Sequence, residues 1–547
     1  MKRRTILTSG ISAVSIGVLG GAGVLLEACN SSSSTPSNQQ STGSVPRPGG
    51  QLRIGTEAEE NGLSPFTSNF DATGIMYARA FYDPLAATDS TGKTHPYLAR
   101  SITPNQDYTT WTIEVRNNVY FHDGSLLDAD ALVLNFSEHL KSPLSGPVLG
   151  PIIKAINKVD PLTIELSMNS PWVPFDVYLC GWIGGQFAYV ASPKAIQAGT
   201  LNTHPVGTGP FVFSQWEPND HLSGTKNPHY WQTGLPYVDS VTFHPLPVEQ
   251  SRSDSLRAGD IDIAHFTDVP TYNALKTNAS FTHVDNIAGE VGPADQDFIM
   301  LNLAKPPMDN LNFRKALASS LDVVSYNKAV NLGLTHIDKS VFQVGSPYHS
   351  VGSYPNYSIK SAREYLKMAG LASSQTSFAL ANVTGPNNQI DLELVGEMIR
   401  QVSINTSQQQ IEQSKYIINA LLGNFDAYFW RQFGAIDPDQ NYTWWSSAFV
   451  KPIGSISLNF ARNSDPVIDK ALLQGRENPQ VEVRVEAYKT VARQINQDIP
   501  YLWQNRALWA VCARGGVHGY DSYRLPDGAV GLGLKSGIFP IVGVWLS

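Results

Sequence analysis

Short runs of alternating apolar and polar residues recur along the chain and predict β-strands. They are rich in β-branched and aromatic residues, are bounded by turn residues, and lie at 51–55, 108–115, 162–166 and 238–245. Longer segments place apolar residues at helical spacing and predict helices at 128–140, 313–330, 362–368, 393–404 and 482–497. Because strands and helices are interleaved throughout, the pattern predicts a mixed α/β fold.

Local signals mark where some of these elements begin and end. Asp123-Gly124 is a tight-turn signal after the run at 119–121, and Asp128 is a candidate N-cap of the helix that follows. Ile499-Pro500 ends the last predicted helix, because proline cannot continue a helix.

The first 28 residues differ from the rest of the chain and predict an export signal. Basic residues at 2–4 precede an uncharged stretch at 5–26, and the twin arginine with its glycine-rich apolar run resembles a Tat signal. Small and apolar residues come before Cys29, as at a lipoprotein processing site, although Glu27 replaces a residue that is usually small or apolar. We therefore expect 1–28 to be a lipoprotein-type signal peptide and Cys29 to be lipidated.

Residues 29–50 are predicted to form a flexible tether. They consist almost entirely of small and polar residues, with proline and glycine, and carry Arg47 as their single charge. The alternative is an uncut membrane helix, since the uncharged stretch at 5–26 is about long enough to span a bilayer. Both interpretations place the body outside the cytoplasmic membrane, on the periplasmic or outer-surface side. No second stretch of the sequence is long and apolar enough to cross, which excludes a channel or permease.

The composition is that of a large globular protein. The chain has 547 residues, 42% of them apolar and 16% charged, so it can bury large cores and form more than one domain. Its net charge of −8 argues against general nucleic-acid binding, which needs a basic field. Three cysteines exclude a disulfide scaffold and a cysteine-based zinc ribbon. Cys180 and Cys512 lie in apolar runs and are expected to be buried and unpaired, although an oxidising compartment allows a disulfide between them.

The sequence carries no recognisable catalytic motif. HExxH, CxxC, a Walker loop and a GxSxG elbow are all missing. Ser325 and Lys328 match the SxxK spacing of penicillin-recognising hydrolases, but no KTG follows. The 12 histidines are scattered, without a pair at metal-binding spacing, so we expect neither a dedicated metal site nor a cofactor. A surface hydrolase is the disfavoured alternative to a binding protein.

A series of short motifs carries a resemblance to a known family. The motifs lie at 108–116, 121–125, 128–129, 205–211, 227–231, 256–262, 301–302, 306–309, 313–317 and Asp322. In this order they resemble the dipeptide/oligopeptide class of extracytoplasmic solute-binding proteins, which is solute-binding protein family 5 and serves as the receptor of ABC importers. The resemblance covers nearly the whole chain after the tether.

The resemblance implies a two-lobed, class II periplasmic-binding-protein-like α/β fold of the peptide-binding type with an inserted extra subdomain. Lobe I would comprise 51–88, 207–298 and 500–547, the inserted subdomain 89–206, and lobe II 299–499. The lobes would close over a peptide or other small polar solute, and the closed form would dock on the permease and ATPase subunits of an importer. We expect a monomer that binds no nucleic acid, makes and breaks no bonds, and is held at the membrane by its lipid anchor.

The resemblance also places the ligand site. In the family, the stretch around a "DP" step in lobe II and the stretch after the first strand of lobe I line the cleft. The corresponding candidates are Trp430, Phe433, Asp437, Tyr442, Trp444, Trp445, Thr56, Glu57 and Asn61. Any single aromatic residue could instead be core, but three tryptophans and a tyrosine within 16 residues alternate with polar residues, which is less typical of a core.

Position 434 bears on the identity of the solute. Peptide-binding members of the family hold the α-ammonium of the ligand with an Asp four residues before the Pro of the "DP" step, and this position is Gly434 here. Asp437 or Asp426 could replace that carboxylate only if the loop is rebuilt. We therefore predict a weakened requirement for a free N-terminus. The solute could be a blocked or cyclic peptide, an oligosaccharide stacked on the tryptophans, a metal chelate or another polar solute.

Overall fold

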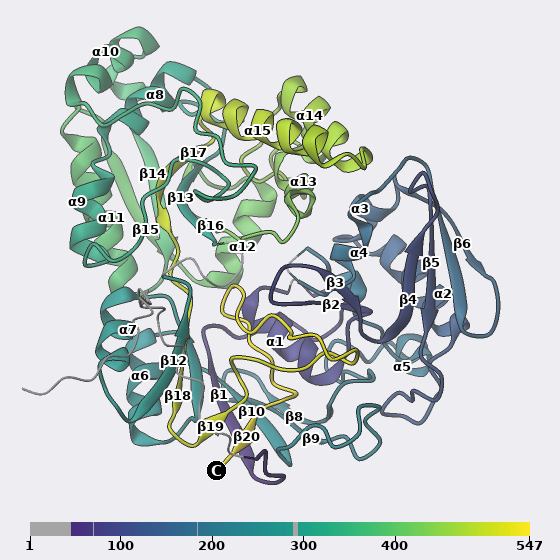
Figure 1. Ribbon diagram of the computed structural model, residues 1–547. Coiled ribbons are helices and arrows are strands. Elements are labelled where there is room, and N and C mark those ends of the chain that lie inside the picture. The colour runs from purple at the N-terminus through teal and green to yellow at the C-terminus, as the bar shows by residue number, and fades with distance from the viewer. Residues whose placement is uncertain (1–44, 69, 183, 288–293) are drawn as a thin grey trace, which may run out of the picture. The chain divides into compact units, whose positions relative to one another are not determined.

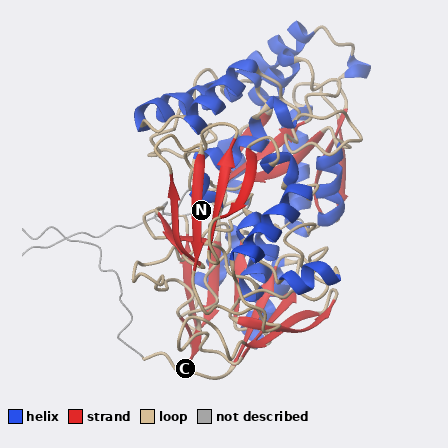
Figure 2. Ribbon diagram, turned by 90° about the vertical axis from the view of Figure 1, so that its right-hand side faces the viewer, coloured by secondary structure: helices blue, strands red, loops and turns tan. Residues whose placement is uncertain are grey.

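The computed structural model describes residues 45–547, apart from 69, 183 and 288–293. The predicted signal peptide, Cys29 and residues 29–44 of the predicted tether lie outside the described residues. Strands and helices alternate along the described chain, so the predicted mixed α/β fold is confirmed (Figure 2). Three larger sheets organise it, and each has its own helices (Figure 1).

The first sheet has seven strands with β1 at its centre. Their order is β12 (Phe281–Asp285), β18 (Ala510–Arg514), β11 (Ile263–Phe266), β1 (Gln51–Thr56), β10 (Ser240–Pro245), β9 (His221–Lys226) and β8 (Phe211–Glu217). β1 pairs in parallel with β10 and β11, and Leu52 and Ile54 are fully buried. The accompanying helices are α1 (Ala72–Phe81), α6 (Glu249–Ala258) and α7 (Val269–Lys276). The loop after β1 and the N-termini of these helices therefore meet at one end of the sheet.

The second sheet has five strands. Their order is β15 (Thr406–Ile411), β14 (Phe378–Val383), β16 (Ala427–Gln432), β13 (Gln296–Leu301) and β17 (Tyr501–Arg506). The helices of this half are α8 (Leu311–Ser320), α9 (Val323–Val330), α10 (Ile359–Ala369), α11 (Pro386–Arg400), α12 (Gln413–Leu422), α14 (Pro466–Glu477) and α15 (Val481–Asp498). α11 packs on β14 and β15 (Figure 1). The chain enters this half through β13 and leaves it through β17, and these two strands pair antiparallel.

The third sheet is antiparallel and lies within residues 89–206. Its order is β4 (Ala99–Pro104), β5 (Thr110–Val115), β7 (Thr163–Met168) and β6 (Ile153–Lys158), with α2 (Ala129–Lys141) packed on β6 and β7. The remaining strands form two small pairs, β2 (Ala86–Thr88) with β3 (Thr94–Pro96) and β19 (Val517–His518) with β20 (Trp545–Leu546). Short helices are α3 (Gly146–Leu149), α4 (Phe175–Tyr178), α5 (Pro193–Ala198), α13 (Tyr442–Trp445) and the 3-10 turns Gln186–Ala188, Ser373–Gln375, Pro438–Asn441 and Ser447–Phe449.

Most predicted elements are present, and one prediction is wrong. The segment 313–330 is not one helix, because Leu321 is extended and the Asp322 side chain caps a new helix by accepting from the Ser325 amide. The other elements shift at their ends; for example, α11 begins at 386, not at 393.

Cys180 and Cys512 are buried and unpaired, as predicted. Cys180 lies in the core of the 89–206 region, Cys512 lies on β18, and each is fully buried and free. Burial raises the pKa of both thiols to about 12, which keeps them protonated and unreactive. Within the described ranges, no helix has the length and apolar character needed to span a bilayer.

Candidate functional site

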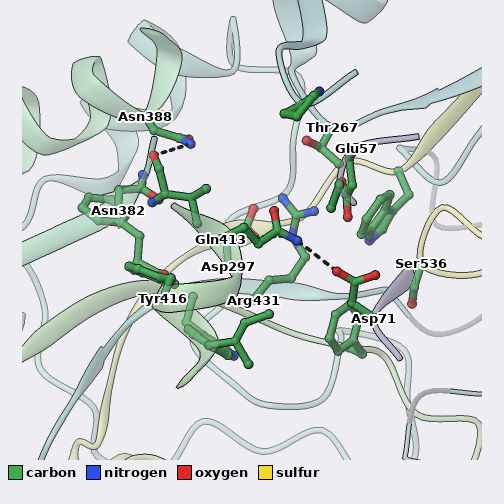
Figure 3. Close-up of a pocket in the computed structure, with 18 of the residues that line it drawn as sticks. Glu57, Asp71, Thr267, Asp297, Asn382, Asn388, Gln413, Tyr416, Arg431 and Ser536 are labelled. Atoms are coloured by element: carbon green, nitrogen blue, oxygen red, sulfur yellow. Dashed lines mark hydrogen bonds and ion pairs between the residues drawn. The ribbon is translucent and has the colours of Figure 1, made fainter. Parts of the chain in front are cut away.

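A large cavity lies between the ends of the two main sheets. Its volume is about 1050 Å³, which is room for about 35 water molecules at liquid density. The loop after β1, the N-termini of α1, α11 and α12, strand β16 and the segment 535–538 all contribute to its wall, as do residues of the 89–206 region. Figure 3 shows Asn382, Asn388 and Tyr416 on one side of the cavity and Glu57, Thr267 and Ser536 on the other. The cavity is therefore large enough for a solute of several residues.

One hydrogen bond crosses the cavity from one half of the molecule to the other. Asp71 is the N-cap of α1 and accepts from the Thr73 and Gly74 amides. Its second oxygen accepts from the Gln413 amide group at 2.9 Å, and Gln413 is the first residue of α12 (Figure 3). The two halves are thus in direct polar contact at the cavity in this structure.

Aromatic side chains form one wall of the cavity. Tyr416 and Trp430 are stacked with ring centroids 5.6 Å apart, and Trp444 and Phe460 pack around Trp430 at 6.4 and 5.4 Å. The Tyr416 hydroxyl donates to two backbone carbonyls, which fixes the orientation of its ring. A rigid aromatic surface of this kind suits aliphatic C–H groups and organic cations.

Glu57 projects into the cavity from the loop after β1. Its carboxylate lies 3.5 Å from the imidazole of fully buried His265. Burial acts to raise the pKa of Glu57, but His265, Arg252 and Arg431 outweigh it and lower the pKa to about 2. Glu57 is therefore ionised, and its charge is already balanced by neighbouring basic groups.

Arg431 is held between a carboxylate and an aromatic ring. Its Nε donates to Asp297 at 2.8 Å, and its guanidinium lies 4.8 Å from the Trp509 ring centroid. Asn505 donates to the other oxygen of Asp297 at 3.2 Å. Arg431 and Asp297 thus form a charge-balanced pair on adjacent strands β16 and β13 of the cavity wall.

The environment of Gly434 contains a second balanced pair. The Gly434 amide donates to Asp295, whose carboxylate also accepts from Trp509 and Ser536, and the Gly434 carbonyl accepts from the Lys535 ammonium. Burial lowers the pKa of Lys535 to about 8, while Asp295 opposes that change. Position 434 itself carries no carboxylate, and the carboxylate nearest to it is engaged by the protein's own groups.

Four of the nine predicted site residues line the cavity. They are Trp430, Phe433, Trp444 and Glu57. The other five do not line it. Thr56 is fully buried, with its hydroxyl 3.4 Å from that of Tyr77, and Asn61 is exposed away from the cavity.

The remaining three candidates are engaged elsewhere in the same half. Asp437 forms a bidentate pair with Arg484 at 2.6 Å. Tyr442 lies under the Arg476 guanidinium at 3.6 Å, and Trp445 is buried against aromatic core residues. Asp426, the other possible substitute for a carboxylate at 434, pairs with Lys305. Neither aspartate is available to a solute.

Several cavity residues were missed at the level of sequence. Asp71 and Asp391 line the cavity, as do Tyr416 and Lys535. Asp71 carries the sequence signal of a helix N-cap, and Gly385-Pro386 marks the start of the helix that bears Asp391. Tyr416 and Lys535 carry no local signal, because only the fold brings them beside Trp430 and Gly434.

A buried polar cluster joins the 89–206 region to the five-stranded half. Asp439 is fully buried and accepts from Arg476 Nε at 2.9 Å, from Trp172 Nε1 at 2.9 Å, and from the Tyr178 hydroxyl. The Val173 amide also donates to the Arg476 carbonyl. We call Asp439, Arg476, Trp172 and Tyr178 the bridging cluster.

In sequence, the chain is similar to bacterial solute-binding proteins. The model of "Bacterial extracellular solute-binding proteins, family 5 Middle" matches residues 93–451. The nickel-binding periplasmic protein of Escherichia coli K12 is 24% identical over 472 residues, which is 80% of this chain and 86% of that protein. The glutathione-binding protein GsiB of Pectobacterium atrosepticum is 28% identical over 349 residues, which is 62% of this chain and 65% of that protein.

Solved structures show the same fold. The periplasmic binding protein DppA of Helicobacter pylori, in complex with the peptide STSA, has a TM-score of 0.80 at 22% identity and covers 91% of this chain and 98% of its own. The oligopeptide-binding protein AppA of Bacillus subtilis, in complex with a nonapeptide, has a TM-score of 0.79 at 21% identity and covers 92% and 100%. NikZ of Campylobacter jejuni, in complex with Ni(L-His), has a TM-score of 0.75 at 20% identity and covers 89% and 97%. The predicted two-lobed fold is confirmed.

Proposed function

Because this chain belongs to the family 5 bacterial extracellular solute-binding proteins, we propose that it is the substrate-binding lipoprotein of an ABC importer, which captures a peptide or similar polar solute and delivers it to a membrane permease. Members of this family bind solutes and are not enzymes. The observation that carries the proposal is the 1050 Å³ cavity, whose wall comes from both main sheets. A solute in it would contact both halves at once.

Hinge closure follows from the connection between the halves. The chain passes between them beside β13 and β17, which pair with each other, so the two connections lie side by side. We propose lobe I at 51–88, 207–298 and 500–547, the inserted subdomain at 89–206, and lobe II at 299–499, with β17 and the first residues of β13 reaching across into the sheet of lobe II. A solute that contacts both lobes only when they are together shifts the population toward the closed form. That closed monomer would be the form that docks on the permease.

We also propose that the protein is anchored outside the membrane by a lipid on Cys29. The support is the sequence pattern of 1–28 and the small, polar tether at 29–50. A tether of this kind lets the binding protein reach the permease while it remains at the membrane surface.

The test begins with the solute that co-purifies with the protein. Native mass spectrometry should show a one-to-one adduct, and denaturation should release a small polar molecule for identification. Adding that molecule back to stripped protein should reduce the radius of gyration and change the fluorescence of Trp430 and Trp444, because both line the cavity. A bound solute with an unchanged scattering profile would contradict closure, and chemical conversion of the solute would contradict a binding role.

Two other solute classes have specific support. The stacked ring of Trp430 and its aromatic neighbours suits an oligosaccharide. A metal chelate is suggested by relatives whose names or titles mention nickel. Within the described residues no three His, Cys, Asp or Glu side chains are placed to hold a metal ion, so such a complex would have to bring its own chelator. Identification of the released molecule separates these classes from a peptide.

A further inference from the structure

The side chains that line the cavity carry an excess of negative charge. Among the described residues, eight carboxylates line it against three basic side chains. Each basic side chain already faces a carboxylate of the protein: Arg252 lies 3.3 Å from Glu249, Arg431 pairs with Asp297, and Lys535 lies beside Asp295. No cationic side chain in the described wall is left to balance the remaining carboxylates.

Asp391 is the carboxylate most clearly without a counter-charge. It projects from the second turn of α11, accepts from the Tyr326 hydroxyl at 2.8 Å, and has the Asn382 amide at 3.5 Å. Within the described chain, no basic side chain lies within ion-pair distance of it. The charged groups that face it from neighbouring elements are Asp297 and Asp268, and both are acidic. Burial, reinforced by these two carboxylates, raises the pKa of Asp391 to about 7.

A second polar group of the cavity wall also lacks a hydrogen-bond partner. Gln504 lies on β17, lines the cavity and is 4% exposed, and its Nε2 atom is buried without a hydrogen-bond acceptor. It lies close to Tyr326, the residue that donates to Asp391. Apart from the Tyr326 hydroxyl, the described residues offer Nε2 no acceptor, so a hydrogen-bond acceptor on the solute would stabilise this buried donor. Asp391 and Gln504 together therefore favour a solute that has a cationic group and, near it, a hydrogen-bond acceptor.

We propose that the solute is an organic cation, whose protonated amine or guanidinium pairs with the Asp391 carboxylate while an adjacent oxygen accepts from Gln504. This inference rests on the proposed function and specifies its solute class. The aromatic wall around Trp430 offers the solute's apolar part a surface that also tolerates positive charge. A basic peptide or another amine-bearing solute has all of these features, and the amine need not be an N-terminus.

The experiment uses stripped full-length protein and calorimetric titration. The probes are three N-acetylated, C-amidated tetrapeptides with alanine at every position except one, which is lysine, norleucine or glutamate, together with spermidine as a cation without peptide bonds. We expect a cation-bearing probe to bind at least about 10-fold more tightly than its neutral and acidic counterparts. Asp391→Asn should weaken the preferred cation by about 30-fold or more, since it removes one partner of a buried charge pair.

Glu393→Gln is the matched control. Glu393 is exposed on the same helix, outside the cavity, and loses the same charge in the same way. It should bind the cation as the unaltered protein does. A thermal melt of the Asp391→Asn variant checks that it folds, and a folded variant with undiminished cation binding overturns the assignment.

The class of solute that binds also tests the inference, and it separates a failure of the inference from a failure of the proposed function. If neutral or acidic probes bind as well as the cation, or if the co-purified solute is neutral or anionic, the inference fails and the proposed function stands. If the co-purified solute is a cation outside the probe set, its loss of affinity on Asp391→Asn supports the inference. If the protein binds no probe and carries no solute, both the inference and the proposed function fail.

Discussion

Replacing Asp439 by alanine tests the bridging cluster most directly. Asp439 is fully buried and does not line the cavity, and the side chain of its partner Arg476 is only 5% exposed. The substitution leaves the Arg476 guanidinium buried without a counter-ion and removes the acceptor of the Trp172 donor, whereas the Tyr178 hydroxyl keeps the backbone carbonyl of residue 439. Removing one member of a buried ion pair typically costs about 3–5 kcal/mol, and each orphaned donor adds about 1 kcal/mol or more unless water reaches it.

The expected loss in the free energy of unfolding is therefore about 4 kcal/mol or more. That is a large share of a typical total of roughly 5–15 kcal/mol. Replacing both partners, as Asp439→Leu with Arg476→Met, removes the buried charges together and should cost much less than the sum of the single changes. The coupling free energy is the difference between the cost of the double change and the sum of the two single changes. We expect it to be at least about 2 kcal/mol if the two side chains form an ion pair.

Urea unfolding of the unaltered protein, Asp439→Leu, Arg476→Met and the double variant measures this coupling, with the slope against urea as a check that the same structure unfolds. The exposed pair of Lys489 and Glu486 on α15 provides the control, since the same kind of cycle there should give a coupling below about 1 kcal/mol. If Asp439→Ala costs less than about 1 kcal/mol, or if the double variant loses the full sum, the charges of the bridging cluster do not stabilise the fold as argued.

Three further predictions follow from the sequence and the site. Cys29→Ala should move the protein from the membrane fraction to the soluble fraction, as shown by fractionation and immunoblotting; retention at the membrane would favour the uncut helix. Asp391→Asn should stabilise the solute-free protein by about 2–4 kcal/mol at pH 8 and by little below pH 4. The sign follows because a carboxyl with its pKa raised to about 7 is unfavourable in the fold once it ionises, so stability is lost as pH rises from about 4 to 7. The lipidated protein, unfolded without reductant, should present two thiols to a thiol reagent, from Cys180 and Cys512; a value of zero would establish a disulfide.

The elements that were predicted best are those whose signal is local. β1 and α15 were found because period-two and helical patterns act within a few residues, and Pro500 marks the end of α15. The helix at 313–330 was predicted as one because its apolar spacing continues across Leu321-Asp322, whereas the cap at Asp322 restarts the helix. The spacing of apolar residues alone does not reveal such a break in a helix.

The site was predicted only in part, for a different physical reason. Trp430 and Asp437 belong to the same stretch, but Trp430 reaches the cavity and Asp437 is held by Arg484, which lies 47 residues away in the chain. Whether an aspartate is free for a solute depends on a partner that only the fold supplies. Lys535 illustrates the same limit, since it reaches Gly434 across 101 residues.

The continuous stretch that forms β17 and β18 has a consequence for the order of folding. β17 completes one edge of the five-stranded sheet beside β13, while β18 is inserted between β11 and β12 in the seven-stranded sheet. Until residues 501–514 are in place, β11 and β12 lack their common neighbour and β13 presents an open edge. Such pairings between segments distant in sequence are slow to form and leave strand edges open to aggregation. Both sheets therefore depend on the same segment for their completion, which couples the folding of the two halves.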